Sequence, residues 1–516
     1  MLSCRNHSLF CLRFFLILTL VILPGLVPAP VQAAPSILYV SATSANCAGM
    51  SPCYATIQAA VDAAGSGDDI RVAAGTYTGA QDRTGTNTYH YKQVVFIDKS
   101  LTLRGGYHPT TWEGPNPAAN PTIIDAGRDG RPVTVLGNGT QQVTLEGLVL
   151  QNGDYTGLGN GTGISNQVCA NTEGDCGGGL FVRSSRIILR DSIVRNNIGT
   201  RTKTSHGGGI FFWEILPDSR IENTRVTGNT LQGIQGYGGG VFVFYGASNL
   251  VIEHSTFAQN QTNGTGGGLY LYQNSGPVRV EDCIISDNTA EEYAGGLYLG
   301  VTFEGLAYQV ERVALLNNHT VYDGAAIEIE KWGSSPSSIK MENILMAGNT
   351  IAITSSTTGI FYIAGGSGAQ MDVELNHLTF ANHPNKVALH LVQDYARPLN
   401  IDLANTLVDN ANHAIAAAEN AGTLVIKDDY TLVYNVVTPY YSIAGIPEFQ
   451  TTHPLTGDPR LTPSFRLGAD SAAIDAGVNA GVLEDIDGDP RPIGGGFDVG
   501  ADEYRPLIFI PIVHQN

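Results

Sequence analysis

Four ionisable residues lie in the variable segments between repeated strand-like phrases, where loops can build a site on a regular scaffold. These candidates for acid–base chemistry are His206, Glu291, Glu292 and Asp323. Adjacent carboxyl groups favour proton transfer if both are partly buried, because each disfavours the charge on the other. Adjacent acids that are exposed to water are far commoner, so the sequence names candidates and assigns no catalytic role.

A second set of candidates is aromatic. In each repeated phrase an apolar residue is followed by one that points to the opposite side of the strand. If the apolar residue faces the interior, two outward columns result. The first aromatic column is Phe181, Phe211, Phe242, Tyr270 and Tyr298, continued by Glu328 and Phe361, and the second aromatic column is Trp213, Phe244 and Tyr272. Such columns stabilise a sheet through stacked pairs, or they bind sugar rings or a partner surface.

Near the C-terminus, Asp485, Asp487 and Asp489 are spaced as in a calcium loop. An EF-hand loop has Gly at its sixth position and Glu at its twelfth. Here Gly488 is the fourth residue and Gly496 the twelfth, so the EF-hand pattern is not met. Calcium in an irregular site is therefore the one cofactor that the sequence admits, and a plain acidic turn is the alternative.

Two polar columns also follow the repeat. The acidic column is Glu222, Glu253, Glu281, Glu311 and Glu342, with Arg220, Arg279 and Lys340 two positions earlier. It predicts a salt-bridged face, with a divalent cation between rungs as the alternative, because like charges on adjacent rungs repel. The other column is Asn152, Asn197, Asn229, Asn260, Asn288, Asn318 and Asn349. We expect it to be structural, because Asn tolerates left-handed turns and its amide can bond to the next rung.

The element that must position these residues is a repeat. A phrase of small residues followed by alternating apolar and aromatic residues, such as Gly266 to Leu271, recurs about every 30 residues, a period typical of solenoids. Each period contains strand-like segments separated by turns. The fold class is therefore all-β, a right-handed parallel β-helix. Residues 54–64 have apolar positions at helical spacing, which predicts a short N-terminal capping helix.

Residues 99–411 resemble the right-handed parallel β-helix proteins of the pectate-lyase-like superfamily, with the GGA[ILV] and FxxN repeats first named in polymorphic outer membrane proteins. Phe257 to Asn260 matches the second phrase literally. Residues 471–504 resemble an anchor-like terminal module of secreted bacterial β-helix proteins. The resemblance implies a polysaccharide lyase or glycoside hydrolase. However, Ser205-His206-Gly207 matches a hydrolase motif only in part, and no calcium-binding Asp cluster is found on the strands.

The organisation that we predict is a signal peptide at 1–33, an N-terminal cap with the first coils at 34–98, a β-helix at 99–420, a C-terminal module at 421–504 and an apolar tail at 505–516. In an exported protein, Cys47 with Cys53 and Cys169 with Cys176 are predicted to form local disulfides. Cys283 falls at a repeat position that takes small residues, which predicts a buried, unreactive thiol.

The formal net charge of −19 argues against nucleic-acid binding, which depends on basic contacts. No apolar run after the signal peptide is long enough to span a membrane. We expect a secreted monomer, extracellular or at the cell surface, that binds a polysaccharide or a cell-surface glycan without catalysis. The alternatives are a polysaccharide lyase or glycoside hydrolase, and a structural surface spacer.

Overall fold

The computed structural model describes residues 34–84, 90–158, 176–202, 204–246, 248–272, 274–366 and 368–506. The chain divides into Met1–Pro35 and Ser36–Asn516, and the second unit contains all the regular structure described below. The predicted signal peptide at 1–33 and most of the predicted tail lie outside the described residues.

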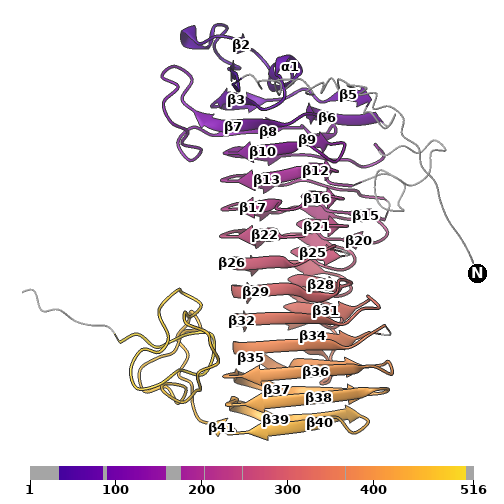
Figure 1. Cartoon of the computed structure of the whole chain (residues 1–516), viewed down its shortest axis with the longest axis vertical. Helices are drawn as coiled ribbons and strands as arrows, with labels where there is room; N and C mark the ends of the chain where they lie inside the picture. Colours follow the sequence, from indigo (N-terminus) through magenta and orange to yellow (C-terminus); the bar gives the residue numbers. More distant parts are fainter. Residues whose placement is uncertain are drawn as a thin grey trace, which may run out of the picture. The chain divides into compact units, whose positions relative to one another are not determined.

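Strands of successive coils pair in parallel and form three faces along one axis (Figure 1). The first face is β6 (His90–Ile97), β9 (Arg131–Leu136), β12 (Leu180–Arg183), β16 (Ile210–Trp213), β21 (Val241–Phe244), β25 (Leu269–Tyr272), β28 (Leu297–Val301), β31 (Ile327–Lys331) and β34 (Gly359–Gly365), followed by the ends of β35 (Met371–Gln393), β37 (Leu407–Glu419) and β39 (Leu432–Ala444). The predicted all-β right-handed parallel β-helix is confirmed.

The second face begins at the N-terminal end and continues through the whole stack. It is β1 (Ile37–Val40), β3 (Asp68–Ala73), β7 (Leu101–Tyr107), β10 (Gln142–Glu146), β13 (Arg186–Arg190), β17 (Arg220–Glu222), β22 (Leu250–Glu253), β26 (Val278–Ser286), β29 (Gly305–Leu316), β32 (Ser337–Ala347), the start of β35, β36 (Pro398–Ala404), β38 (Thr423–Asp429) and β40 (Glu448–Thr452).

The third face is made of shorter strands and of the later parts of long ones. It is β4 (Gly75–Tyr77), β8 (Thr122–Asp125), β11 (Leu148–Gln151), β14 (Ile193–Arg195), β18 (Arg225–Thr227), β23 (Thr256–Ala258), the ends of β26, β29 and β32, the middle of β35, the starts of β37 and β39, and β41 (Leu455–Thr456).

Smaller elements complete the coils. They are β2 (Cys53–Tyr54), β5 (Gln81–Thr84), β15 (Ser205–His206) with β20 (Gly236–Tyr237), the five-stranded sheet of β19 (Thr230–Leu231), β24 (Gln261–Thr262), β27 (Thr289–Ala290), β30 (His319–Thr320) and β33 (Thr350–Ile351), a 3-10 turn (Cys47–Gly49) and α1 (Ile57–Ala63).

Helix α1 has the capping role that its apolar spacing predicts. The side chain of Thr56 accepts a hydrogen bond from the backbone N–H of Ala59, and Ile57, Ala60 and Val61 are buried against the first coils. The predicted disulfide between Cys47 and Cys53 is present beside it.

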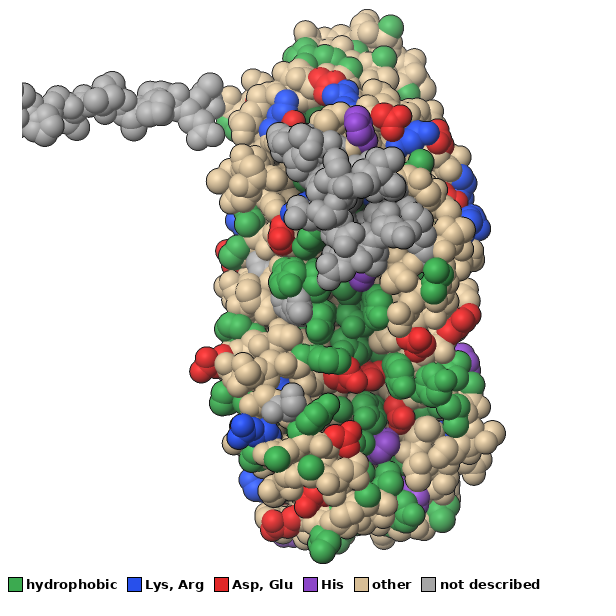
Figure 2. All heavy atoms as spheres, turned by 90° about the vertical axis from the view of Figure 1, so that its right-hand side faces the viewer, with side chains coloured by type: hydrophobic (Ala, Val, Ile, Leu, Met, Phe, Trp, Pro, Cys, Tyr) green, Lys and Arg blue, Asp and Glu red, His purple; other side chains and the backbone are tan. Residues whose placement is uncertain are grey.

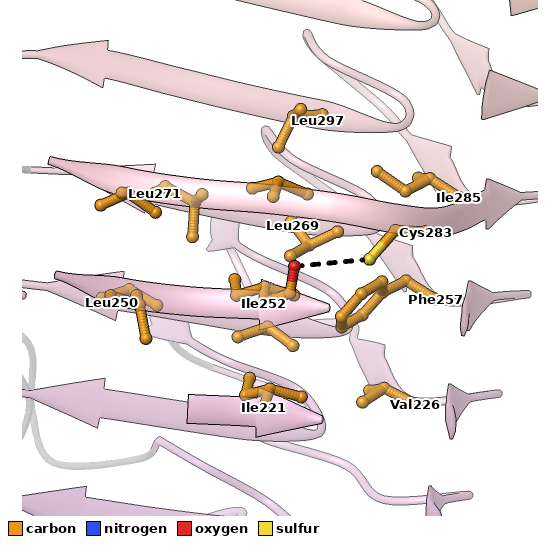
Figure 3. Close-up of a cluster of buried hydrophobic side chains, with 14 of the residues drawn as sticks. Ile221, Val226, Leu250, Ile252, Phe257, Leu269, Leu271, Cys283, Ile285 and Leu297 are labelled. Carbon is orange, nitrogen blue, oxygen red and sulfur yellow. Dashed lines mark hydrogen bonds between the residues drawn. The ribbon is translucent and has the colours of Figure 1, made fainter. Parts of the chain in front are cut away.

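The interior is filled by the apolar residues that alternate with the outward columns. Figure 3 shows part of it, with Ile221, Ile252 and Leu269 pointing inward from successive coils. The Cys283 thiol is buried among them, 3.6 Å from the carbonyl oxygen of Ile252. Burial raises the pKa of this thiol to about 12, which keeps it protonated and unreactive, as the sequence predicts.

The repeated glycines are required where loops of adjacent coils meet. Gly238 has a φ of +74°, and a Cβ on Gly239 would lie 2.7 Å from the carbonyl oxygen of Gly267. A Cβ on Gly238 would clash with the carbonyl oxygen of Val241 in its own coil, and a Cβ on Gly239 would push neighbouring rungs apart. The small-residue phrase is therefore the point of closest approach between coils, immediately before the first face.

The Asn column forms a continuous amide ladder. Asn229 Nδ2 donates to Asn260 Oδ1 at 3.0 Å, and Asn260 Nδ2 donates to Asn288 Oδ1 at 3.0 Å. The left-handed turn is taken by the residue before the ladder position, for example Gln259 with a φ of 56°. The inclusion of Asn152 is wrong by one residue, because the backbone N–H of Gly153 occupies its rung and donates to Asn197.

The coils continue beyond the boundary predicted at residue 420. Strand β38 pairs in register with β36, β40 pairs with β38, and β41 pairs with β39, so the last coil ends at Thr456. Residues 457–506 then pack on the coils, where the side chain of Asn343 donates to the carbonyl oxygen of Glu484 and accepts from Arg491. The long strands β35, β37 and β39 pass through corners without Gly-rich turns, which hides their repeat in the sequence.

Candidate functional site

The first aromatic column is in register across five coils of the first face. Its ring centroids are 5.6 Å apart for Phe181 and Phe211, 5.3 Å for Phe211 and Phe242, and 5.0 Å for Phe242 and Tyr270. Tyr270 and Tyr298 stack at 4.1 Å with their planes 13° apart. The predicted column of stacked rings therefore exists, and its closest pair lies at the Tyr270–Tyr298 step.

The continuation of this column differs from the prediction. Glu328 follows Tyr298, but its partner on the next coil is Tyr362 and not Phe361. Phe361 pairs with Ile327 and is buried in the core, because β34 starts one residue out of step with the repeat. Tyr362 in turn is aligned with His390 of β35.

The N-terminal part of the aromatic surface is covered. Phe181 and Phe211 are fully buried and Trp213 is nearly so, which for these three favours the stacking role over the ligand-binding role that the sequence left open. The His206 ring lies over the column, 5.8 Å from Phe211, and the Arg183 guanidinium lies 4.1 Å from the Trp213 ring. In these coils the columns serve packing.

Further along the same face the rings line an open cleft of about 520 Å³, which we call the aromatic cleft. Figure 2 shows a strip of hydrophobic surface along this face with acidic side chains within it. The described lining residues are His206, Gln235, Tyr237, Phe242, Phe244, Tyr245, Thr265, Tyr270, Tyr272, Glu292, Tyr293, Tyr298, Glu328, Glu330 and Trp332. None of them is Lys or Arg.

Glu328 is the most unusual side chain in the aromatic cleft. It is only 2% exposed, and its Oε2 atom has no hydrogen-bond partner. Burial raises the pKa of Glu328 well above its ordinary value, and the charges of Glu330 and Asp323 raise this pKa further. Burial and these neighbouring charges thus favour the protonated form of the carboxyl group, whose Oε2 atom lies without a partner in the wall of the cleft.

Glu330 lies on the same strand, two residues on, and so points to the same side as Glu328. The Tyr298 hydroxyl donates to Glu330 Oε2 at 2.8 Å, and Trp332 Nε1 donates to the Tyr298 hydroxyl at 2.9 Å. Trp332 is 58% exposed at the rim. This chain of hydrogen bonds fixes an exposed indole, a stacked phenol and a carboxylate relative to one another.

Of the four sequence candidates for acid–base chemistry, the fold brings two, His206 and Glu292, to the aromatic cleft. His206 lines the cleft, but burial lowers its pKa to about 3, so the ring is neutral near pH 7. Glu292 lines the cleft and accepts from Gln235 Nε2 at 3.2 Å, whereas Glu291 is exposed outside it. Asp323 Oδ1 lies 3.0 Å from His390 Nδ1. Glu291 and Glu292 therefore have different surroundings and do not share one partly buried site.

Sequence reasoning placed Glu328 in the column without assigning it chemistry, and it missed Glu330, Trp332, Tyr362 and His390. A pattern in the sequence marks only Glu330 among these four, together with Glu328. Strand β31 carries Glu at both outward positions, where the two preceding strands carry Tyr or Gly. When one coil departs from the residue type that the other coils share, packing of the scaffold does not explain that residue, and the position becomes a candidate for function.

The acidic column is neutralised largely by the predicted basic residues. Arg220 bridges Glu222 and Glu253 at 3.1 and 3.2 Å, Arg279 pairs with Glu281, and Lys340 pairs with Glu342 at 2.7 Å. Glu311 lies 3.6 Å from Arg312. These ion pairs favour the salt-bridged face over a cation between rungs.

The acidic group near the C-terminus contains other residues than the calcium site that the sequence predicts. Asp485, Asp487 and Asp502 are the group with metal-ligand spacing among the described residues, while Asp489 pairs with Arg505 at 2.7 Å. Arg466 binds both oxygens of Asp487 at 2.6 Å. A guanidinium therefore already supplies the positive charge that calcium would bring, and Asp489 is not part of the group.

The second predicted disulfide is only partly visible. Cys176 is disulfide-bonded, and Cys169 lies outside the described residues. In the part of the chain that is described, no helix is long and apolar enough to cross a membrane.

Comparison with known proteins bears on the fold. Residues 133–304 match the family model described as a right handed beta helix region. Among solved structures, the pectate lyase Pel9A is similar at 12% identity, with 92% of this chain and 97% of that chain covered and a TM-score of 0.41. A family 28 exopolygalacturonase from Yersinia enterocolitica is similar at 14% identity, with 82% and 78% covered and a TM-score of 0.29. No curated protein matches the chain in sequence.

Proposed function

We propose that the protein binds a carbohydrate chain in the aromatic cleft. The observation that carries this proposal is the combination of stacked rings with an unused proton donor. Phe244 and Tyr272 are partly exposed in the cleft, and Trp332 is exposed at its rim. These rings present surface of the kind on which the apolar faces of sugar rings pack, above the buried Tyr270–Tyr298 stack. In its protonated form, Glu328 can donate a hydrogen bond to a sugar hydroxyl or ring oxygen, because its Oε2 atom has no partner within the protein.

Export is part of the same proposal. The basic and apolar pattern of residues 1–33 is typical of a secretory signal peptide. The disulfide between Cys47 and Cys53 is a bond that persists in oxidising compartments. Both features support a secreted protein, outside the cell or at its surface, which we expect to be monomeric.

Binding can be tested by titrating the purified protein with oligosaccharides of six or so units and measuring heat or fluorescence. Trp332→Ala and Tyr272→Ala should each weaken binding by about tenfold or more, since aromatic anchors dominate such contacts. Tyr395→Ala is the matched control, because Tyr395 is exposed outside the cleft. Equal affinities for all three variants would contradict the proposal, and binding of no glycan would favour a structural spacer.

A second candidate function is cleavage of the bound glycan. The observation that favours it is the raised pKa of Glu328 beside Glu330 on one strand, because a buried carboxylic acid next to a carboxylate is the arrangement that glycoside hydrolases use. In that case Glu328 would protonate the leaving oxygen. Release of reducing ends that is lost in Glu328→Gln, with oligosaccharide affinity retained, would establish an enzyme.

A further inference from the structure

The carboxyl groups of the aromatic cleft lack the basic partners that several other acids in the protein have. Glu281 pairs with Arg279, Glu342 with Lys340, and Glu503 with Arg491. In the aromatic cleft, Glu292, Glu328 and Glu330 have no ion pair with any described residue. Their hydrogen-bond partners are the neutral groups of Gln235 and Tyr298, and Glu328 Oε2 has none.

Two carboxylates, Glu292 and Glu330, that share one cleft with the buried Glu328 and have no cation are unfavourable for the protein alone. Each desolvated charge disfavours the other, and in a partly buried site solvent screens this repulsion less than at an open surface. Glu328 and Glu330 nevertheless lie on β31, the strand where the aromatic pattern breaks, and Glu292 lines the same cleft from the segment before β28. A ligand that brings a positive charge would relieve this repulsion.

The rings around these carboxyl groups favour the same kind of ligand. Tyr270 and Tyr298 stack on the floor, and Tyr272 and Trp332 meet edge to face at 6.3 Å on one side. Aromatic faces attract ammonium groups through their quadrupoles, most strongly for Trp and Tyr and where water is partly excluded. Carboxylates and aromatic faces together can bind a sugar that carries an ammonium group, since the carboxylates attract the charge and the rings pack on the apolar face of the sugar.

From this arrangement we infer that the aromatic cleft selects glycans that carry ammonium groups, that is, oligomers of amino sugars, and disfavours glycans that carry carboxylates. The inference rests on the proposed carbohydrate binding and names its substrate class. Glu292 and Glu330 provide the negative charge, Glu328 provides the buried polar atom that faces the ligand, and the rings pack against the sugar faces. A polymer of uronic acids would bring like charge to a cleft whose described lining has no basic side chain.

The experiment uses three hexamers that differ mainly in charge: glucosamine, N-acetylglucosamine and galacturonate. Titration calorimetry is performed at about pH 5.5, at which the sugar amine is protonated. We expect the glucosamine hexamer to bind at least about tenfold more tightly than the neutral hexamer at low salt, and this preference to shrink as salt is added. The galacturonate hexamer should bind most weakly.

Variants of the cleft carboxyl groups test which residues cause the preference for the glucosamine hexamer. Glu330→Gln keeps an acceptor for the Tyr298 hydroxyl, and combined with Glu292→Gln it should reduce the preference to about threefold or less while the neutral hexamer still binds. Glu291→Gln is the matched control, because this neighbour is exposed outside the cleft. Melting temperatures of the variants show that they are folded.

The outcomes separate the two proposals. If none of the hexamers, nor a wider glycan panel, binds, the proposed function itself fails. If neutral and charged hexamers bind equally, or the galacturonate hexamer binds most tightly, carbohydrate binding stands and the inferred ammonium selectivity is overturned. A preference that survives the double variant would also overturn it, because the charge that it needs would then lie elsewhere.

Discussion

Glu328 occupies on β31 the register position that Tyr298 occupies on β28. One step along the coil axis therefore changes the column from a stacked phenol to a buried carboxylic acid. The second outward position changes as well, from Gly300 to Glu330. The strand after the last stacked ring thus turns an aromatic packing surface into a polar one, and this transition is where the aromatic cleft lies.

The amide ladder predicts a large loss of stability for Asn260→Ala. Asn260 accepts from the backbone and side chain of Asn229 and donates to Val226 and Asn288, all within the interior. Buried groups left without partners should lower the free energy of unfolding by about 2–4 kcal/mol. Urea unfolding followed by circular dichroism measures this change. Asn420→Ala, which removes an exposed hydrogen bond to Asp394, should change it by less than about 0.5 kcal/mol.

Glu328 predicts a specific pH dependence of stability. The pKa of Glu328 is raised well above 4.5 in the folded protein. Its contribution to the free energy of unfolding is therefore fully present below about pH 4.5 and is lost as the pH rises through the folded pKa. Glu328→Gln removes this pH-dependent contribution. Relative to wild type, the variant should therefore gain stability as pH rises from about 4.5 toward neutrality. Thermal melts across this range test it, and a constant difference between the two proteins would show that the carboxyl group is not held protonated.

The sequence was sufficient for the scaffold because the scaffold repeats. Stacked glycines, the Asn ladder and the alternating strands each impose the same residue on coil after coil, which makes them visible as columns. The cleft depends on residues that differ from the repeat. Such a difference occurs on one coil only, so no recurring pattern in the sequence identifies it. The burial of Phe211 under His206 is set by a loop, and the displacement of Phe361 by a one-residue offset in β34, so neither follows from strand periodicity.

Calcium should not stabilise this protein. The Asp485, Asp487 and Asp502 group already contacts Arg466, and Asp485 Oδ1 accepts from the backbone N–H groups of Asp487 and Asp489 at 2.9 and 2.8 Å. A cation would have to displace the guanidinium. We expect melting temperatures in millimolar calcium and in excess chelator to agree within about 1 °C, since a ligand stabilises only by binding the folded state. A rise with calcium that saturates would reinstate the metal site.

The packing of residues 457–506 on the coils depends on a fully buried ion pair. Arg491 Nη1 lies 2.8 Å from Glu503 Oε2, both side chains are inaccessible, and Arg491 also donates to Asn343 of β32. Removing one partner leaves a buried charge, so Arg491→Met should destabilise this region by about 3–5 kcal/mol. Limited proteolysis should then cleave after Thr456 while the coils stay intact. Arg505→Ala, which breaks an exposed pair with Asp489, is the control and should leave the cleavage rate unchanged. Equal protection in both variants would mean that apolar contacts alone, such as those of Leu467 and Val499, hold the region in place.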